Sequence, residues 1–122
     1  MEDIEQGVLN LDCLFCKIAA GEIAASILYR DEEIVVFRDI DPQAPAHLLA
    51  IPVMHLENLA AAAESQPQLL LALLRKCAEL GRELGGPRGY RLVVNTGPDG
   101  GQTVGHLHFH LLAGRKLQWP PG

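Results

Sequence analysis

The sequence contains no uninterrupted apolar run approaching the roughly 20 residues that a membrane-spanning helix needs. Its first eleven residues, MEDIEQGVLNL, carry three acids and neither Lys nor Arg, whereas a secretory signal begins with positive charge. These absences predict a protein with no membrane segment and no signal peptide. The cytoplasm is therefore the expected compartment.

Positive charge is also scarce, because 10 Lys and Arg residues stand against 15 Asp and Glu residues and the formal net charge is -5. Proteins that bind nucleic acid need a broad basic surface to neutralise phosphates. We therefore expect no nucleic acid partner, while a small ligand that is recognised locally remains compatible with this composition.

Cysteine is rare too: there are three, an odd number, and two of them are spaced as Cys13-x-x-Cys16. Without an export signal this spacing does not indicate a disulfide framework. It leaves open two core cysteines, a redox pair or half of a zinc site, of which we favour the zinc site. The third, Cys77, falls on the leucine-rich face of a predicted helix and is expected in the core.

The length of 122 residues and the hydrophobic fraction of 48% suit one domain with one core. We expect residues 1–11 to be a loosely ordered lead-in and residues 12–122 to form a single domain. Apolar periodicity and turn residues predict helices over 15–21, 57–64 and 66–84 and strands over 27–29, 34–37, 47–51, 90–95 and 106–112. The short links between strands favour an α+β domain with a mainly antiparallel sheet over a parallel βαβ array.

Three of the five histidines alternate with apolar residues in the segment His106-Leu107-His108-Phe109-His110-Leu111-Leu112. Successive side chains of a strand point to opposite faces, so the three imidazoles share one face. A solvated strand is usually filled with Thr, Lys, Glu or Ser instead, so this row indicates function. Its two ends, His106 and His110, would be roughly 13 Å apart, too far for both to bind one zinc ion. The roles of the three histidines must therefore divide between the two ends of the strand.

The segment before this row, Asp99 to Gly105, is rich in glycine and carries Gln102 and Thr103. Glycine N–H groups can approach an anion closely, and the amide and hydroxyl can donate hydrogen bonds to phosphate oxygens. The pattern alone fits an ordinary turn as well as an oxyanion loop. Its position suggests donors around a phosphoryl or acyl group that the central histidine attacks.

The histidine row fits at every position the motif His-φ-His-φ-His-φ-φ, in which φ is apolar. The sequence over about residues 13–122 thereby resembles the histidine triad (HIT) superfamily and, within it, the Hint branch of histidine triad nucleotide-binding proteins. The segments that carry the resemblance are Phe37-Arg38-Asp39-Ile40, Pro42-Gln43-Ala44-Pro45 with His47, Gly89-Tyr90-Arg91, Asn95, Gly100-Gly101-Gln102 and Trp119-Pro120-Pro121-Gly122.

The resemblance implies a HIT-like α+β fold: a mainly antiparallel five-stranded sheet with one long and one or two short helices, continued across a homodimer. It implies a purine nucleoside phosphoramidate hydrolase, which releases AMP or GMP from P–N linked amines through a covalent nucleotidyl-histidine. His108 would be the nucleophile and His110 would contact the phosphate and help to protonate the departing amine. His47 would assist that end of the site, and the chemical step would require no cofactor.

The same resemblance assigns nucleotide-binding residues. Phe37 and Ile40 would line the purine slot, and Asp39 would bind the ribose hydroxyls. The residues expected around the phosphate are Asn95, Gly101, Gln102, Thr103, Val104, His108 and His110. Thr103 stands where relatives commonly have Ser, which keeps the hydroxyl. Gly105 replaces an aromatic residue often found there, a change that affects the rim of the site rather than its chemistry.

For the Cys13-x-x-Cys16 pair the resemblance implies a structural Zn²⁺. Zinc needs two further ligands. Zinc-containing relatives use a histidine after the Ile-Pro strand and the first histidine of the row, which are His55 and His106 here. Loss of this ion should reduce stability before it reduces activity.

Two other functions stay open. A second branch of the superfamily hydrolyses dinucleoside polyphosphates with the same fold. The ending Trp119-Pro120-Pro121-Gly122 favours the Hint branch, in which Trp119 reaches across the dimer toward the partner's leaving-group site. The alternative from another class is a nucleotide-binding regulatory or interaction module in which hydrolysis is incidental.

Overall fold

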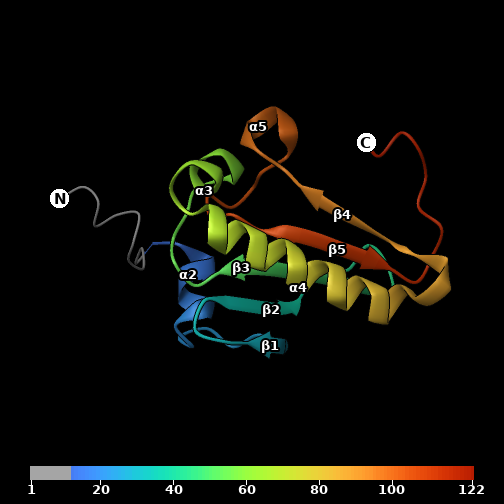
Figure 1. Ribbon diagram of the computed structural model, residues 1–122, viewed down its shortest axis with the longest axis horizontal. Coiled ribbons are helices and arrows are strands. Elements are labelled where there is room, and N and C mark those ends of the chain that lie inside the picture. Colours follow the sequence, from blue (N-terminus) through green and yellow to red (C-terminus); the bar gives the residue numbers. More distant parts are fainter. Residues whose placement is uncertain (1–11) are drawn as a thin grey trace.

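The computed structural model describes residues 12–122, which form one antiparallel sheet in the order β1-β2-β3-β5-β4 together with a long helix and shorter ones (Figure 1). The strands are β1 (Ile27–Arg30), β2 (Ile34–Arg38), β3 (Ala46–Pro52), β4 (Tyr90–Val94) and β5 (Phe109–Ala113). The helices are α2 (Leu14–Ala19), α3 (Leu59–Ser65), α4 (Pro67–Gly85), the 3₁₀ turn η1 (Gly86–Arg88) and the single turn α5 (Gly97–Gly100). The predicted α+β class and five-stranded antiparallel sheet are confirmed. The predicted lead-in over residues 1–11 lies outside the described residues.

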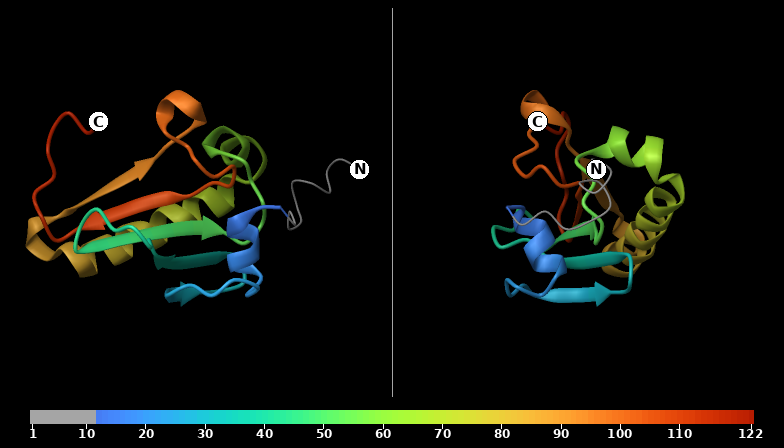
Figure 2. Two further views of the ribbon diagram at one scale, coloured as in Figure 1. Left: turned by 180° about the vertical axis from the view of Figure 1, so that it is seen from behind. Right: turned by 90° about the vertical axis from the view of Figure 1, so that its left-hand side faces the viewer.

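Helices cover both faces of the sheet, α4 on one and α2 on the other (Figure 2). This explains why β2 and β3 carry continuous apolar runs rather than alternating ones, since both of their faces are buried. Among residues 12–122, no helix combines the length and apolarity needed to cross a membrane.

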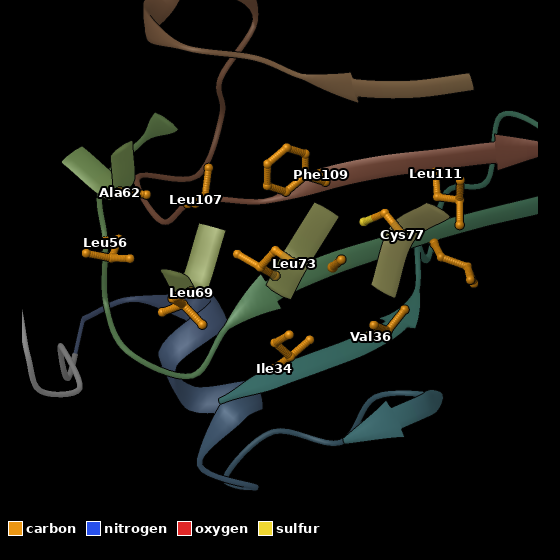
Figure 3. Close-up of a cluster of buried hydrophobic side chains, with 12 residues drawn as sticks. Ile34, Val36, Leu56, Ala62, Leu69, Leu73, Cys77, Leu107, Phe109 and Leu111 are labelled. Carbon is orange, nitrogen blue, oxygen red and sulfur yellow. The ribbon is translucent and has the colours of Figure 1, made fainter. Parts of the chain in front are cut away.

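The larger core lies under α4 (Figure 3). Leu73 and Cys77 of the helix pack there with Phe109 and Leu111 of β5. The prediction that Cys77 belongs to the core is confirmed, because its side chain is fully buried. Burial also raises the pKa of this thiol to about 11, so it stays protonated and unreactive near neutral pH.

The smaller core lies under α2 on the opposite face. Phe15 and Ile18 of the helix pack there with Val35, Phe37 and Leu49 of the sheet. Cys13 caps this helix, its Sγ accepting a hydrogen bond from the backbone N–H of Cys16 at 3.4 Å. The helix therefore brings both cysteines against the same sheet face that the histidines occupy.

The prediction of one strand over residues 106–112 is wrong at its start, because β5 begins at Phe109. The pairing of β5 with β3 and with β4 stops at Phe109, opposite Ala50 and Val94, although β3 itself continues to Pro52. Instead the N–H of Leu107 donates to the carbonyl of Leu56 at 2.7 Å. Leu107, Phe109 and Leu111 still face the α4 core, which leaves the histidines on the other face.

Candidate active site and metal centre

The structure divides the three histidines of the row between two clusters, as the strand spacing predicts. His106 is fully buried beside the two N-terminal cysteines, whereas His110 lies against His47 of β3. His108 stands between them, its ring centroid 5.1 Å from that of His110. One end of the site therefore offers sulfur and nitrogen ligand atoms, and we call it the sulfur-rich end. The other end offers only nitrogen and oxygen atoms, from Asp39, His47 and His110.

At the sulfur-rich end, Cys13, Cys16, His55 and His106 bring four ligand atoms within 4.8 Å of one another. The sulfur of Cys16 is 3.2 Å from Nδ1 of His55, and the sulfur of Cys13 is 3.3 Å from Nδ1 of His106. In a tetrahedral zinc site, bonds of about 2.3 Å to sulfur and 2.0 Å to nitrogen separate these atoms by roughly 3.5 Å. The four residues thus fit a tetrahedral metal ion of this kind.

Hydrogen bonding leaves Nδ1 of His106 available as a ligand. Its Nε2 lies 2.9 Å from the carbonyl oxygen of Pro52, which can only accept, so Nε2 carries the ring proton. Burial lowers the pKa of His106 to about 4 and also lowers that of His55. Both rings are therefore neutral near pH 7, the state that a metal ligand requires.

The tautomer of His108 is fixed by the backbone. Its Nδ1 lies 2.8 Å from the carbonyl oxygen of His106 and must donate to it, which leaves the lone pair on Nε2. The ring of Phe15 packs edge-on against the His108 ring, with the centroids 5.0 Å apart. Sequence reasoning did not assign Phe15, because an aromatic residue between two cysteines carries no signal beyond a place in the core.

At the other end, a chain of hydrogen bonds orients His110. The backbone N–H of Gln43 donates to Nδ1 of His47 at 3.0 Å, so the proton of His47 is on Nε2. That Nε2 lies 3.0 Å from Nδ1 of His110 and 3.4 Å from a carboxylate oxygen of Asp39. His110 accepts on Nδ1 and consequently carries its own proton on Nε2.

Burial is the main cause that lowers the pKa of His110 to about 4, with smaller contributions from His108 and His47, while Asp39 acts in the opposite direction. His110 is thus neutral near pH 7. The ligand atoms of Asp39, His47 and His110 are close enough to hold a metal ion. A metal ion on Nε2 of His47 would require the ring proton on Nδ1, where the Gln43 N–H already points. The hydrogen bonding therefore favours a proton relay at this end.

A family pattern described as the HIT domain matches residues 20–117, most of the chain. The chain belongs to the HIT domain family. A HIT-like protein of Synechococcus elongatus, described as uncharacterized, is 50% identical over 93% of this chain and 100% of its own length. A 14 kDa zinc-binding protein of Zea mays is 45% identical over 89% of this chain and 87% of its own. The crystal structure of a HIT family hydrolase from Legionella pneumophila is 48% identical, with a TM-score of 0.86 over 90% of this chain and 99% of that one.

The residues predicted to hold the nucleoside lie along and after β2 of the HIT domain. Phe37 is buried, with its ring 5.6 Å from that of Phe15, whereas the side chain of Ile40 is 100% exposed. Asp39 is half-buried, and its second carboxylate oxygen accepts the N–H of Asp41 at 2.9 Å. An exposed apolar side chain next to a ring and a carboxylate is compatible with the predicted purine and ribose contacts, which stay predictions.

The loop before the histidines is braced by Gln102. Its amide oxygen accepts the N–H of Gly97 at 3.0 Å, and its amide nitrogen donates to the carbonyls of Glu57 and Val104 at 2.8 and 3.1 Å. Gln102 therefore shapes this loop of the HIT domain through all of these bonds, and its phosphate contact stays a prediction.

Three other residues predicted near the phosphate lie in or beside this loop. Gly101 adopts a φ of +88°, and a Cβ there would lie 3.8 Å from Nδ2 of Asn95. Thr103 is exposed. Glycine at position 101 thus permits a left-handed turn that keeps the Asn95 amide close to the loop backbone.

Trp119, predicted to reach the partner subunit, is 81% exposed near the end of the HIT chain. The segment that precedes it is anchored by Arg91, whose guanidinium donates to the carbonyl of Gln118 at 3.0 Å. A large apolar side chain in solvent on an anchored segment is suited to contact with another molecule.

Proposed function

We propose that this HIT protein is a purine nucleoside phosphoramidate hydrolase that works through a nucleotidyl-histidine on His108. The observation that carries the proposal is the hydrogen bond from Nδ1 of His108 to the carbonyl of His106. It places the ring proton on Nδ1 and so directs the lone pair of the imidazole to Nε2, the nitrogen that would attack phosphorus. The 48% identity to a HIT family hydrolase supports a hydrolytic role.

In the first step, Nε2 of His108 forms a bond to phosphorus while the P–N bond breaks and the amine leaves. The proton that the amine needs passes from a solvent water through Nε2 of His110, whose ring is held in place by the hydrogen bond between its Nδ1 and the Nε2–H of His47. In the second step water attacks phosphorus, releases the nucleoside monophosphate and returns one proton to the relay. Proton transfer by a positioned histidine contributes typically about 10²- to 10⁴-fold to the rate.

Binding of the substrate would fall to the residues on either side of the histidines. Phe37 and Ile40 would hold the purine and Asp39 the ribose hydroxyls. The phosphate would lie among the remaining predicted residues, which are Asn95, Gly101, Gln102, Thr103 and Val104 with His108 and His110.

The test is intact-protein mass spectrometry within seconds of adding an adenosine phosphoramidate, together with measurement of AMP release. The native chain should show a transient adduct of one AMP, and His108→Ala should show neither adduct nor turnover, a loss of at least about 10³-fold. AMP release that is independent of His108 would contradict the mechanism. Turnover of dinucleoside polyphosphates alone would favour the second branch, and binding without any turnover would favour the regulatory module.

The second part of the proposal is that Zn²⁺ is the ion held by Cys13, Cys16, His55 and His106. Two sulfur and two nitrogen ligands at these separations are typical of structural zinc, which supplies cross-linking rather than chemistry. The zinc-binding description of the Zea mays relative supports this choice. The ion would tie α2 to the segment that precedes β5.

Metal removal tests this part. We expect one zinc per chain by elemental analysis, and a chelator should lower the melting temperature and make Cys13 and Cys16 reactive toward an alkylating reagent. Cys16→Ala should lose the metal, whereas the matched control Cys77→Ala should keep it. A native chain without stoichiometric zinc, or a melting temperature unchanged by the chelator, would contradict the assignment.

A further inference from the structure

A cavity of about 250 Å³ is lined by residues from the start of β4, the end of β5 and the segment that follows β5. Figure 1 shows where these segments lie in the fold. Four cationic side chains line it together with Tyr90 and Leu112, and we call it the basic pocket. The four are Arg88, Arg91, Arg115 and Lys116. They make up four of the ten Lys and Arg residues in a chain whose net charge is -5, so the pocket concentrates positive charge that the rest of the surface lacks.

No carboxylate neutralises this charge in the part of the chain that the structure describes, since the ion pairs of residues 12–122 lie elsewhere. Two of the guanidinium groups are held in place by carbonyl oxygens instead. Arg91 donates to Gln118 at 3.0 Å and Arg115 donates to Gln43 at 2.9 Å. These bonds fix the cations and leave their charge available to a ligand.

The basic pocket lies further along β5 than the catalytic cluster, and Leu112 of its lining relates the two. Leu112 lies two residues beyond His110 in β5, and the two side chains point to the same face of the sheet. Arg91 is the cross-strand partner of Leu112 on one side and His47 is its partner on the other. The pocket therefore begins roughly 7 Å along the strand from His110, on the side away from His108.

We propose that the basic pocket binds a carboxylate carried by the amine that departs from phosphorus. This inference rests on the proposed function, because His110 is the residue that protonates the amine. An amine that leaves there and continues toward Leu112 would place a carboxylate among the four cations. Extended 6-aminohexanoate separates its nitrogen and carboxylate by roughly 7–8 Å, which matches that distance.

The experiment compares kcat/KM for three adenosine phosphoramidates: those of 6-aminohexanoate, of its neutral primary amide and of glycine. The glycine compound keeps the carboxylate but is too short to reach the basic pocket. The 6-aminohexanoate compound should be preferred over the amide by about tenfold or more, the effect of one good charge-assisted hydrogen bond. The glycine compound should show no such advantage.

The variants are Arg88→Gln with Lys116→Gln, which removes two pocket cations, and Arg75→Gln with Arg82→Gln, which removes two cations elsewhere as a control for net charge. Arg75 and Arg82 are exposed on α4, which lies on the opposite face of the sheet. The double variant should lose the preference for the carboxylate while hydrolysing the amide at the native rate. The control should keep the preference.

Equal kcat/KM for the carboxylate and amide compounds in the native chain would overturn the role of the basic pocket but not the proposed function. So would a preference that survives in the double variant. Absence of turnover with all three compounds would overturn the proposed function and, with it, the role of the basic pocket. The two failures are therefore distinguishable.

Discussion

At the scale of single residues, hydrogen bonds to backbone groups decide what each imidazole can do. The carbonyl of Pro52 leaves Nδ1 of His106 available to the proposed zinc, and the carbonyl of His106 leaves Nε2 of His108 available for the proposed attack on phosphorus. The N–H of Gln43 sets the direction of the relay from His47 to His110. His106 thereby links the two ends of the site, because its side chain lies with the two cysteines and its carbonyl accepts from His108.

The pKa of His110 leads to a pH prediction. Its folded value of about 4 lies below the ordinary 6.5, so the unfolded chain binds a proton between these values that the folded chain does not. The stabilisation is therefore complete above pH 6.5 and is lost as the pH falls toward 4. Between pH 7.5 and 5 we expect His110 to account for a loss of about 1 kcal/mol, after allowance for its partial exposure.

The measurement is urea denaturation of native protein and His110→Gln at both pH values. Gln keeps an acceptor for His47 but does not titrate in this range. The native chain should lose more stability than the variant on acidification. An equal loss in both would contradict the lowered pKa of His110.

At the scale of elements, the contact between α4 and β4 is close because Gly81 has no side chain. A Cβ at this position would lie 2.6 Å from ring carbons of Tyr90, at the first residue of β4. The ring thus packs directly on the helix backbone. This contact holds the edge strand, and with it one wall of the basic pocket, against the long helix.

Gly81→Ala should therefore destabilise the protein by about 1–2 kcal/mol, because the overlap outweighs the better helix propensity of Ala. Gly85→Ala is the matched control, since its Cβ would meet its nearest neighbour at 3.4 Å. That variant should be neutral or up to about 1 kcal/mol more stable. Urea denaturation checks both, and a Gly81→Ala protein as stable as native would contradict the close contact. In a Tyr90→Ala background the cost of Gly81→Ala should disappear.

At the scale of the whole molecule, the sheet has two edges with different character. The β1 edge is interrupted by a register shift between Ile27 and Tyr29 and ends in Arg30, features that discourage pairing with another chain. The β4 edge is regularly paired to β5 and, within residues 12–122, has no strand on its outer side. Homodimerisation through β4 would continue the sheet into the partner subunit, as the sequence resemblance implies. It would also bring Trp119 near the candidate active site of the partner subunit.

We expect the native chain to sediment as a dimer of the 13.3 kDa protomer. Val93→Lys should shift it to monomer, because Val93 is half-exposed, lies outside both cores and would place like charges at the edge where two β4 strands meet. The control is Leu28→Lys on β1, which should remain dimeric. A native monomer at micromolar concentration, or dimers in both variants, would contradict pairing through β4.

The sequence by itself determined the local features of this protein. Apolar periodicity predicted the strands and placed Cys77 on the buried face of the long helix, because burial follows the period of each element. The short links between strands predicted that the sheet is mainly antiparallel. The spacing of the row showed that His106 and His110 belong to different clusters, since strand geometry fixes their separation. The segments that resemble the HIT family named the candidate site residues.

Only the tertiary structure decided what depends on groups far apart in the chain. Pairing with β3 and β4 set the start of β5 at Phe109, which the alternating pattern could not show. Pro52, Gln43 and Phe15 prepare the histidines through a carbonyl, an N–H and a ring edge. Backbone groups are the same in every residue, so no sequence pattern marks those that will meet an imidazole. The basic pocket likewise arises because folding brings the start of β4 beside the C-terminal segment.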